Sequence, residues 1–574
     1  MATVDDPRSR SDDRRRLFFA LVAIAAVALI ARLIFLGDRV AHWDEGRVAY
    51  WTLRYAKTGV WEYRPIVHGP FLFHVNKYVF TLLGPTDFAM RLVVAIVGGL
   101  LPLTAWNFRE HLRDLEVGVL GALLAFNPLL LYYSRFMRND LLVAAFMFVA
   151  LGFFVRAYDT GKHRYFYVGV LAFALAFTTK ESAILYPVCW AGAAVLLLDH
   201  RLFRARDRLP HSWKQEVVDY GFWLRDVLRA WAIPLVVGLV EFFVVIVVFY
   251  APRVGGDGVG FDTMFSNPAL LPAVVERATV GSWETFYGLW IAGGHQDHAY
   301  LPYLGDFIET LAFGAGPLVL FAVIGFIADR YSREGPRDLV ALAAYWGFVS
   351  ILGYPIVTDI MAPWATINAI VPLAIPAAVG VALILRWGRE AFEDEDMVSV
   401  GLTAMLIIFV AGFTVGTAVD VAYLNSASEE NKELLQWAQP HNEIRPTLEK
   451  ISAISENHDD GPDVLFYGTT PPGSSEERFY VSNESSTLYA PPGGPSWHTR
   501  LPLPWYFEAD GAQVTSTKPG TDPESIEDMP PVVIAYEWDR EELEPHLEGY
   551  TAYEHEFRLW ADTIVIFVDE SQLQ

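Results

Sequence analysis

Two adjacent carboxylates, Asp44 and Glu45, lie in the segment HWDEGRVAYW (residues 42–51), directly after the first long apolar run. A carboxylate at a membrane surface can take a proton from an attacking hydroxyl group and so act as a general base. It can equally cap a helix, because Asp accepts backbone N–H bonds and Glu is favoured in a first turn. The pattern therefore leaves two interpretations of Asp44: the N-cap of a helix over 45–58, or the base of an active site.

Four further polar clusters each adjoin an apolar segment: YRPIVHGP (63–70), YYSRFMRND (132–140), TTKESAILYP (178–187) and DIMAPWATI (359–367). The residues in them that could carry chemistry are His68, Arg135, Arg138, Asp140, Lys180, Glu181 and Trp364. Each has a structural alternative. His68 could shape a turn, the two arginines could snorkel to lipid headgroups, Lys180 and Glu181 could pair, and Trp364 could join the interfacial aromatic belt.

Cations and carboxylates on one membrane face suit transfer from an anionic, lipid-linked donor. A guanidinium group matches the oxygens of a phosphate, so Arg135, Arg138 and Lys180 are candidate phosphate ligands. Asp44 is the candidate base for the acceptor hydroxyl, and Glu45 a supporting or metal-contacting neighbour. Because the leaving phosphate is already a good anion, the reaction needs no separate general acid.

Long apolar runs predict a chain that crosses the membrane many times. The sequence is 53% hydrophobic, and about twenty apolar residues span the roughly 30 Å hydrocarbon core. Eleven segments, give or take two, are predicted spans: 17–36, 86–108, 117–134, 140–157, 165–179, 182–198, 231–251, 310–328, 338–357, 365–386 and 398–423. Residues 71–84 are shorter and more polar, which predicts an interfacial helix.

Lysine and arginine in the connections predict the orientation. Alternate connections are basic, at 109–116, 156–165, 201–215, 329–338 and 386–390, whereas the long connection at 252–309 holds only Arg253 and Arg277. This places residues 1–16 in the cytoplasm, a polytopic part over 17–424, and the tail over 425–574 outside the cell membrane. All the polar clusters then lie outside. Arg135, Arg138 and Lys180 are exceptions there, because outer connections are normally poor in lysine and arginine.

The tail is strongly acidic. Residues 425–574 hold 29 Asp and Glu against 8 Lys and Arg, a net charge of −21 out of −24 for the chain. This balance excludes nucleic acid as a partner and suits a halophilic source. Helical stretches (SEENKELLQWA, REELEPHLEGY) alternate with strand-like ones (DVLFYG, PVVIAYEW, DTIVIFVD), which predicts a small α/β domain.

The segments HWDEG, HGPFLF, SRFMRND, TTKES and APW together resemble membrane glycosyltransferases of the GT-C type, the class of the protein O-mannosyltransferases and aminoarabinose transferases. More closely, they resemble the archaeal flippase-activity-associated proteins, over roughly residues 17–390. The resemblance implies a GT-C-like helical membrane protein with a catalytic Asp44. It also implies contacts of Arg135, Arg138, Asp140, Lys180 and Glu181 with the donor.

Two functions remain open from the sequence. One is an inverting hexosyltransferase that moves a sugar from a polyprenyl (dolichyl) phosphate to a glycan or protein acceptor at the outer face. The other is a non-catalytic flippase or flippase-associated protein for dolichyl-phosphate-linked sugars in N-glycosylation. A divalent cation is an option for either, and the single Cys189 excludes a disulfide framework.

The predicted orientation can be tested by proteolysis. A protease added to intact cells or right-side-out vesicles should remove the tail beyond about residue 425 and spare the connection at 199–230. Immunoblots with tags at either position give the readout. A protected tail together with a cleaved connection would invert the topology.

Overall fold

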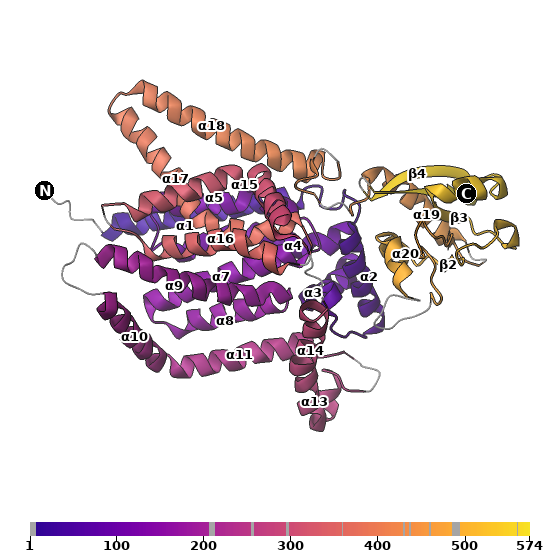
Figure 1. Cartoon of the computed structure of the whole chain (residues 1–574), viewed down its shortest axis with the longest axis horizontal. Helices are drawn as coiled ribbons and strands as arrows, with labels where there is room; N and C mark the ends of the chain where they lie inside the picture. The colour runs from indigo at the N-terminus through magenta and orange to yellow at the C-terminus, as the bar shows by residue number, and fades with distance from the viewer. Residues whose placement is uncertain are drawn as a thin grey trace.

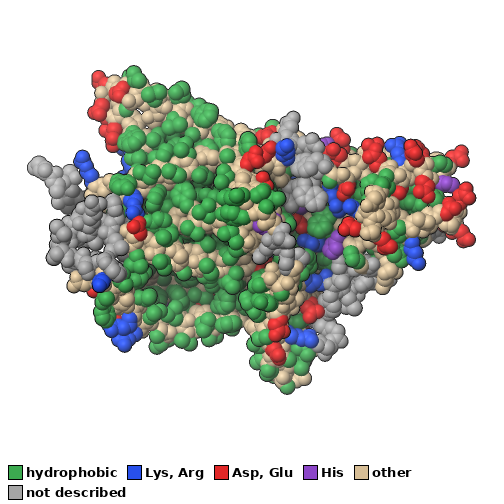
Figure 2. All heavy atoms as spheres, in the orientation of Figure 1, with side chains coloured by type: hydrophobic (Ala, Val, Ile, Leu, Met, Phe, Trp, Pro, Cys, Tyr) green, Lys and Arg blue, Asp and Glu red, His purple; other side chains and the backbone are tan. Residues whose placement is uncertain are grey.

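The computed structural model describes residues 7–205, 213–253, 258–293, 298–333, 335–358, 360–428, 431–435, 438–458, 461–484, 494–558 and 561–573. Figure 1 shows a bundle of roughly parallel helices at one end and a small α/β domain at the other. Hydrophobic side chains cover the middle of the bundle, whereas charged side chains gather at its two ends and over the α/β domain (Figure 2). This distribution is that of a multi-pass membrane protein.

Within the described ranges, nine helical segments are long and apolar enough to cross a membrane. They are α1 (Pro7–Leu33), α4 (Asp87–Leu100) continued by η2 (Leu101–Phe108), α7 (Asn139–Thr160), η3 (Glu181–Ile184) with α9 (Leu185–Ala205), α11 (Ala232–Tyr250), α15 (Tyr300–Arg330), α16 (Asp338–Val357), η7 (Pro363–Thr366) with α17 (Ile367–Glu393), and α18 (Met397–Val419) with η8 (Asp420–Leu424).

The other two predicted spans are also helical but shorter. The segment at 117–134 is divided into α5 (Asp114–Phe126) and α6 (Pro128–Tyr133), because Asn127 ends one helix and caps the next ahead of Pro128. The segment at 165–179 forms α8 (His163–Phe177), of 15 residues. The predicted helical character is therefore confirmed, and nine lies within the predicted number.

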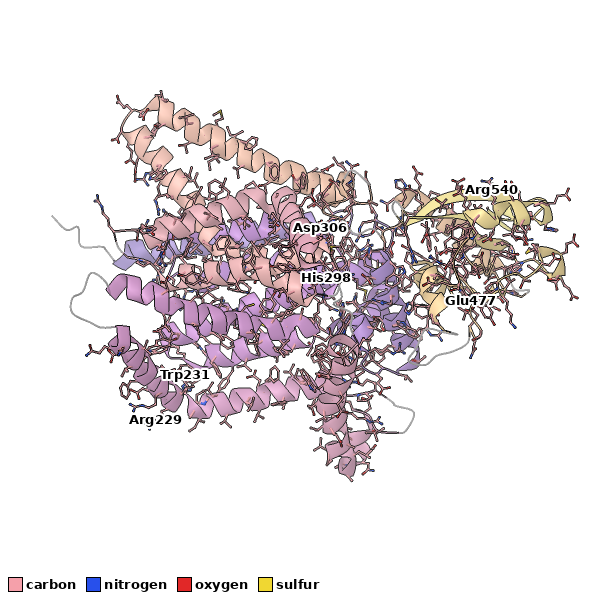
Figure 3. All side chains as sticks on the ribbon, in the orientation of Figure 1. Arg229, Trp231, His298, Asp306, Glu477 and Arg540 are labelled. Atoms are coloured by element: carbon pink, nitrogen blue, oxygen red, sulfur yellow. The ribbon has the colours of Figure 1, made fainter. Side chains whose placement is uncertain are left out.

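Short helices cover the end of the bundle that faces the C-terminal domain (Figure 1). α2 (Trp43–Thr58) and α3 (Phe71–Leu83) are joined by η1 (Pro65–Val67) and pack on each other. Within 252–309, helical turns form α12 (Thr263–Ser266), η4 (Pro268–Leu270), α13 (Leu271–Glu276), η5 (Arg277–Gly281), α14 (Ser282–Phe286) and η6 (Tyr287–Ile291). At the opposite end, α10 (Trp213–Ala230) leads into α11, and residues 206–212 of the basic connection lie outside the described ranges. Figure 3 marks the two ends, with Arg229 and Trp231 at one and His298 and Asp306 at the other.

The C-terminal domain is built on a five-stranded sheet in the order β2-β1-β3-β5-β4. β1 (Val464–Phe466), β2 (Val514–Ser516) and β3 (Val532–Tyr536) are parallel, whereas β5 (Asp562–Val568) runs antiparallel to β3 and to β4 (Thr551–Arg558). α19 (Arg445–Asn457) and α20 (Leu503–Asp510) contribute to the hydrophobic core on one face, and α21 (Arg540–Leu543) to that on the other. The predicted α/β class and its three strand segments are confirmed, and the helical stretch predicted at 540–550 is confirmed over 540–546, as α21 and η14 (Glu544–His546).

The helix predicted for SEENKELLQWA is wrong for the described residues 431–435, which form turns. The carbonyl oxygen of Leu434 accepts a hydrogen bond from the Tyr133 hydroxyl at 2.6 Å, and that of Glu433 from Thr310 Oγ1 at 3.0 Å. Leu434 and Leu435 are buried in the core of the bundle. Tertiary bonds to the bundle therefore take carbonyl groups that a helix would use internally.

The helices α15 and α17 cross at close range through glycine. A Cβ atom on Gly325 would lie 1.9 Å from the carbonyl oxygen of Pro376, and one on Gly380 would lie 2.2 Å from that of Phe321. Small residues at such crossings let helix backbones approach within a membrane. This contact fixes α17, whose N-terminal end continues from η7, which carries Trp364.

We expect Gly325→Ala to lower the thermal unfolding temperature in detergent by several degrees, because the added methyl group must push two backbones apart. Gly305→Ala, on the same helix, is the matched control because no atom lies within 4 Å of its Cβ position. Equal unfolding temperatures of the two variants would contradict the close crossing of α15 and α17.

Candidate active site

The first turn of α2 holds the two adjacent carboxylates. The helix begins at Trp43 and its N-cap is His42, whose Nδ1 accepts the N–H of Asp44 at 3.1 Å. Glu45 closes the capping box by accepting the N–H of His42 at 3.0 Å. The interpretation of Asp44 as the N-cap is therefore wrong, since the helix starts before Asp44 and leaves that carboxylate free for other contacts.

Glu45 is completely buried between two arginines. Arg91 holds both carboxylate oxygens at 2.9 Å, and Arg39 donates to one of them at 3.0 Å. The N–H of Met137 donates to the other at 2.8 Å. Burial alone would raise the pKa of the Glu45 carboxyl, but the charges of Arg39 and Arg91 lower it to about 2. Glu45 is thus a permanently charged anchor with no exposed surface.

Asp44 points the other way and stays partly open, with 16% of its side chain exposed. Its carboxylate is held by Arg47 at 3.0 Å and by Arg138. The guanidinium of Arg138 lies flat over the ring of Trp364, 3.6 Å from the ring centre. Trp364 is buried, so it is no belt aromatic facing lipid.

The other predicted clusters join this contact. Asp140 accepts from Arg138 at 3.4 Å and from Lys180 at 2.7 Å. The result is a row of alternating charges that runs from Arg47 through Asp44, Arg138 and Asp140 to Lys180. All three residues beyond Asp44 have side chains at most 15% exposed, and such water-poor charges interact strongly.

Glu181 begins a second contact beside Lys180. It accepts a hydrogen bond from the Tyr63 hydroxyl at 2.7 Å and lies 3.2 Å from Nδ1 of His68. Burial raises the pKa of Tyr63, and the nearby charge of Glu181 adds to the effect. The expected Lys180–Glu181 ion pair does not form, because the two side chains take different partners.

Arg135 stands apart from the other predicted residues. Its guanidinium donates to the carbonyl oxygens of Arg32, Ile34 and Phe35 at 2.6–3.0 Å and to that of Ala31 at 3.3 Å. It lies 4.6 Å from the ring centre of Tyr423. Arg135 therefore caps the end of α1 in this arrangement, although it is only three residues from Arg138.

Two hollows are lined by residues next in sequence to this cluster, Glu181 beside Lys180 and Pro363 beside Trp364. An apolar groove of about 200 Å³ between α8, α11 and α14 ends at Tyr63 and Glu181. A polar cavity of about 440 Å³ lies at the N-terminal ends of α15 and η7, beside Pro363, with Asp306, Glu309, Lys432 and Glu433 on its walls. Among the described residues, no group of three or more His, Cys, Asp or Glu side chains has a geometry suited to a metal ion.

Sequence reasoning missed the arginines that organise the site, namely Arg39, Arg47 and Arg91. Arg91 had a usable signal, because it lies inside an apolar span where a charge is costly and normally has a dedicated partner. Arg47 had one as well, since it follows Asp44 at the i+3 position of a helix. Arg39 sits in a loop, and its type and spacing carry no such signal.

Comparisons with known proteins agree with this architecture. Residues 67–213 match the family model of dolichyl-phosphate-mannose-protein mannosyltransferases, and residues 444–569 match that of the Agl23 flippase-associated protein C-terminal domain. Two solved structures of ArnT from Cupriavidus metallidurans are similar. The apo form has a TM-score of 0.57 at 15% identity over 96% of this chain and 98% of that one. The form bound to undecaprenyl phosphate has a TM-score of 0.54 at 16% identity over 95% and 97%.

The chain has the GT-C fold. The apo oligosaccharyltransferase of Archaeoglobus fulgidus is also similar, with a TM-score of 0.50 at 12% identity over 94% of this chain and 73% of that one. No curated protein sequence matches the chain. The two family matches and the shared fold confirm both predicted resemblances, to GT-C membrane glycosyltransferases and to flippase-associated proteins. The flippase-associated match lies in the tail, outside the residues 17–390 whose motifs carry that resemblance.

We expect Glu45→Gln to destabilise the protein by about 3–5 kcal/mol, because it leaves two buried arginines without their anion. Glu62→Gln, which removes the same charge from an exposed residue, is the control. Thermal unfolding in detergent measures both. Since the folded pKa of Glu45 is about 2 and its ordinary value 4.5, the difference from wild type should be full above about pH 4.5 and shrink toward pH 2. A loss no larger than that of Glu62→Gln would contradict the anchoring role.

Proposed function

We propose that the protein transfers a sugar from a polyprenyl phosphate to an acceptor hydroxyl at the outer face of the membrane, with Asp44 as the general base. The observation that supports this most directly is the row Arg47–Asp44–Arg138–Asp140–Lys180, whose one partly open carboxylate is flanked by cations. A base beside phosphate-binding groups is what an inverting displacement at a sugar phosphate requires.

The donor fits between the row and the apolar groove. We assign the phosphate to Arg47, Arg138 and Lys180, and the polyprenyl chain to the groove that ends at Tyr63 and Glu181. ArnT, which shares the fold, binds undecaprenyl phosphate, and this supports the same lipid class here. Arg135 is left out, because it contacts neither the row nor the groove and instead lines a separate cavity at the end of α1.

The reaction then follows from these positions. As the phosphate draws Arg47 and Arg138 toward itself, the Asp44 carboxylate is released to the acceptor hydroxyl. The hydroxyl oxygen attacks the anomeric carbon while its proton passes to Asp44. The bond between that carbon and the phosphate oxygen breaks, and the polyprenyl phosphate leaves with the electron pair. Lys180 and Arg138 stabilise the charge that develops on it.

The remaining predicted residues would hold the substrates in place. Glu181 and His68 lie together at the mouth of the groove, where they can accept from and donate to sugar hydroxyls. Asp140 keeps Arg138 and Lys180 apart and correctly aimed, and Trp364 supports Arg138 from beneath. The polar cavity beside Pro363 is the candidate approach for a glycan or protein acceptor.

A second function, that of a flippase or flippase-associated protein for dolichyl-phosphate sugars, is favoured by the family match of residues 444–569. It would use the same cations and the same groove to hold the lipid phosphate. It would not need a base, because no glycosidic bond is made or broken. Asp44 therefore separates the two functions.

We expect Asp44→Asn to reduce sugar transfer by about 10²–10⁴-fold, because the amide cannot take the proton. Asp44 does not cap α2, so the helix start should survive. The test compares a deletion strain complemented with wild type or with the variant, by mass spectrometry of its lipid-linked sugars and glycoproteins, followed by initial rates in isolated membranes. Membrane levels of the two proteins must match. Normal glycosylation with Asp44→Asn would favour the flippase-associated function instead.

A further inference from the structure

A separate cavity lies where α1 ends and η8 returns to the bundle. It has a volume of about 260 Å³, and its walls include Arg39, Tyr132, Arg135, Tyr423, Ser426 and Asn442. None of its lining residues belongs to the groove beside Glu181 or to the cavity beside Pro363. The donor and acceptor sites proposed above therefore leave it unused.

Positive charge accumulates around this cavity. Among the described residues, Arg135 donates to carbonyl oxygens of α1 and its end, and to no carboxylate. Arg32 is not on the cavity wall but lies near Arg135 and Tyr423, and it is fully buried. It donates to the carbonyl oxygens of Ala28 and Ala125 at 3.0 Å, and its Nε and Nη2 have no hydrogen-bond partner in the described ranges. Buried cations without an anion are costly, so such a cluster calls for a negative ligand.

The nearby carboxylates do not balance these charges. Arg39 shares Glu45 with Arg91, so one anion serves two cations. The single carboxylate on the cavity wall, Asp38, is exposed, and water screens its charge. Asp87 also lies near Arg39 and Arg91 but pairs with Arg445 at 2.8 Å, so five arginines face three carboxylates, one of them exposed.

The cavity adjoins apolar surfaces that face the membrane. On α1, Val27, Ile30 and Ile34 are 45–57% exposed at helical spacing, and Phe35, which lines the cavity, is 64% exposed. Most of α18 is unburied, and Figure 1 shows its middle standing away from the bundle. The end of α18 and η8 contact the bundle beside the cavity, where the buried Ala418 and Ala422 pack on Leu131.

We propose that this cavity binds the phosphate group of an anionic membrane phospholipid whose chains lie along α1 and α18. The phosphate supplies the negative charge that balances Arg135 and Arg39. Polar contacts to the same group are offered by Tyr132, Ser426 and Asn442. Because Arg39 also holds Glu45, the bound lipid supports the anchor of α2 from outside the active site. The site does not depend on the sugar transfer proposed above.

Native mass spectrometry of the full chain in detergent can test this site by titration with dioleoylphosphatidylglycerol, dioleoylphosphatidylcholine and inorganic phosphate. The key variant is Asn442→Asp, which keeps the shape of the side chain and the acceptor for the Val40 N–H at 3.0 Å but adds a negative charge. Asn457→Asp adds the same charge on an exposed part of α19 and is the matched control. Ser426→Asp places the charge on another wall and serves if Asn442→Asp does not fold.

The expected result is tight binding of one phosphatidylglycerol by wild type and Asn457→Asp, and about tenfold weaker binding by Asn442→Asp and Ser426→Asp. Phosphatidylcholine, which has no net charge, should bind at least tenfold more weakly to the wild type. Equal affinity for the two lipids, or equal phosphatidylglycerol binding by all variants, would overturn the proposal. Displacement of phosphatidylglycerol by millimolar inorganic phosphate would overturn the assignment of a lipid ligand and would indicate a site for a free anion.

Discussion

The pairing of Glu45 with Arg91 and Arg39 is the constraint on which the end of the bundle beside the C-terminal domain depends. One carboxylate ties the first turn of α2 to a residue inside a membrane-crossing helix, to the loop after α1 and to the backbone at Met137. These bonds to the buried Glu45 carboxylate fix both the position of α2 and its rotation about its axis. Any rotation of α2 would break several charge-assisted hydrogen bonds together. The neighbouring Asp44 is thereby forced to face the opposite side.

The C-terminal domain completes this frame. Asp87, at the start of α4, accepts hydrogen bonds from Arg445 at 2.8 Å, from Tyr506 at 3.0 Å and from Trp505 at 3.1 Å. Gly46 leaves room for Pro502, since a Cβ atom there would lie 2.6 Å from the Cβ of that proline. The domain therefore packs directly on the helix that carries the two carboxylates.

Hydropathy was sufficient to find the membrane helices, because hydrocarbon demands about twenty apolar residues whatever the tertiary contacts. Hydropathy was insufficient where tertiary hydrogen bonds decide the local structure. The stretch at 431–435 has a helical pattern, yet its carbonyl groups bond to Tyr133 and Thr310. Likewise, Arg135 and Arg138 look equivalent in the sequence. Only the turn between α6 and α7 sends one to the end of α1 and the other to Asp44.

The contacts between α2 and the last third of the chain have a consequence for biosynthesis. Trp43 donates to the carbonyl oxygen of His498, and Arg39 donates to Gln439, so residues made early rest on residues made hundreds of positions later. During translation, every membrane helix could be made before the residues of the C-terminal domain that support this part of the chain exist. The region around α2 would then gain its last contacts only when that domain has folded against it, which ties completion of the proposed site to completion of the polypeptide.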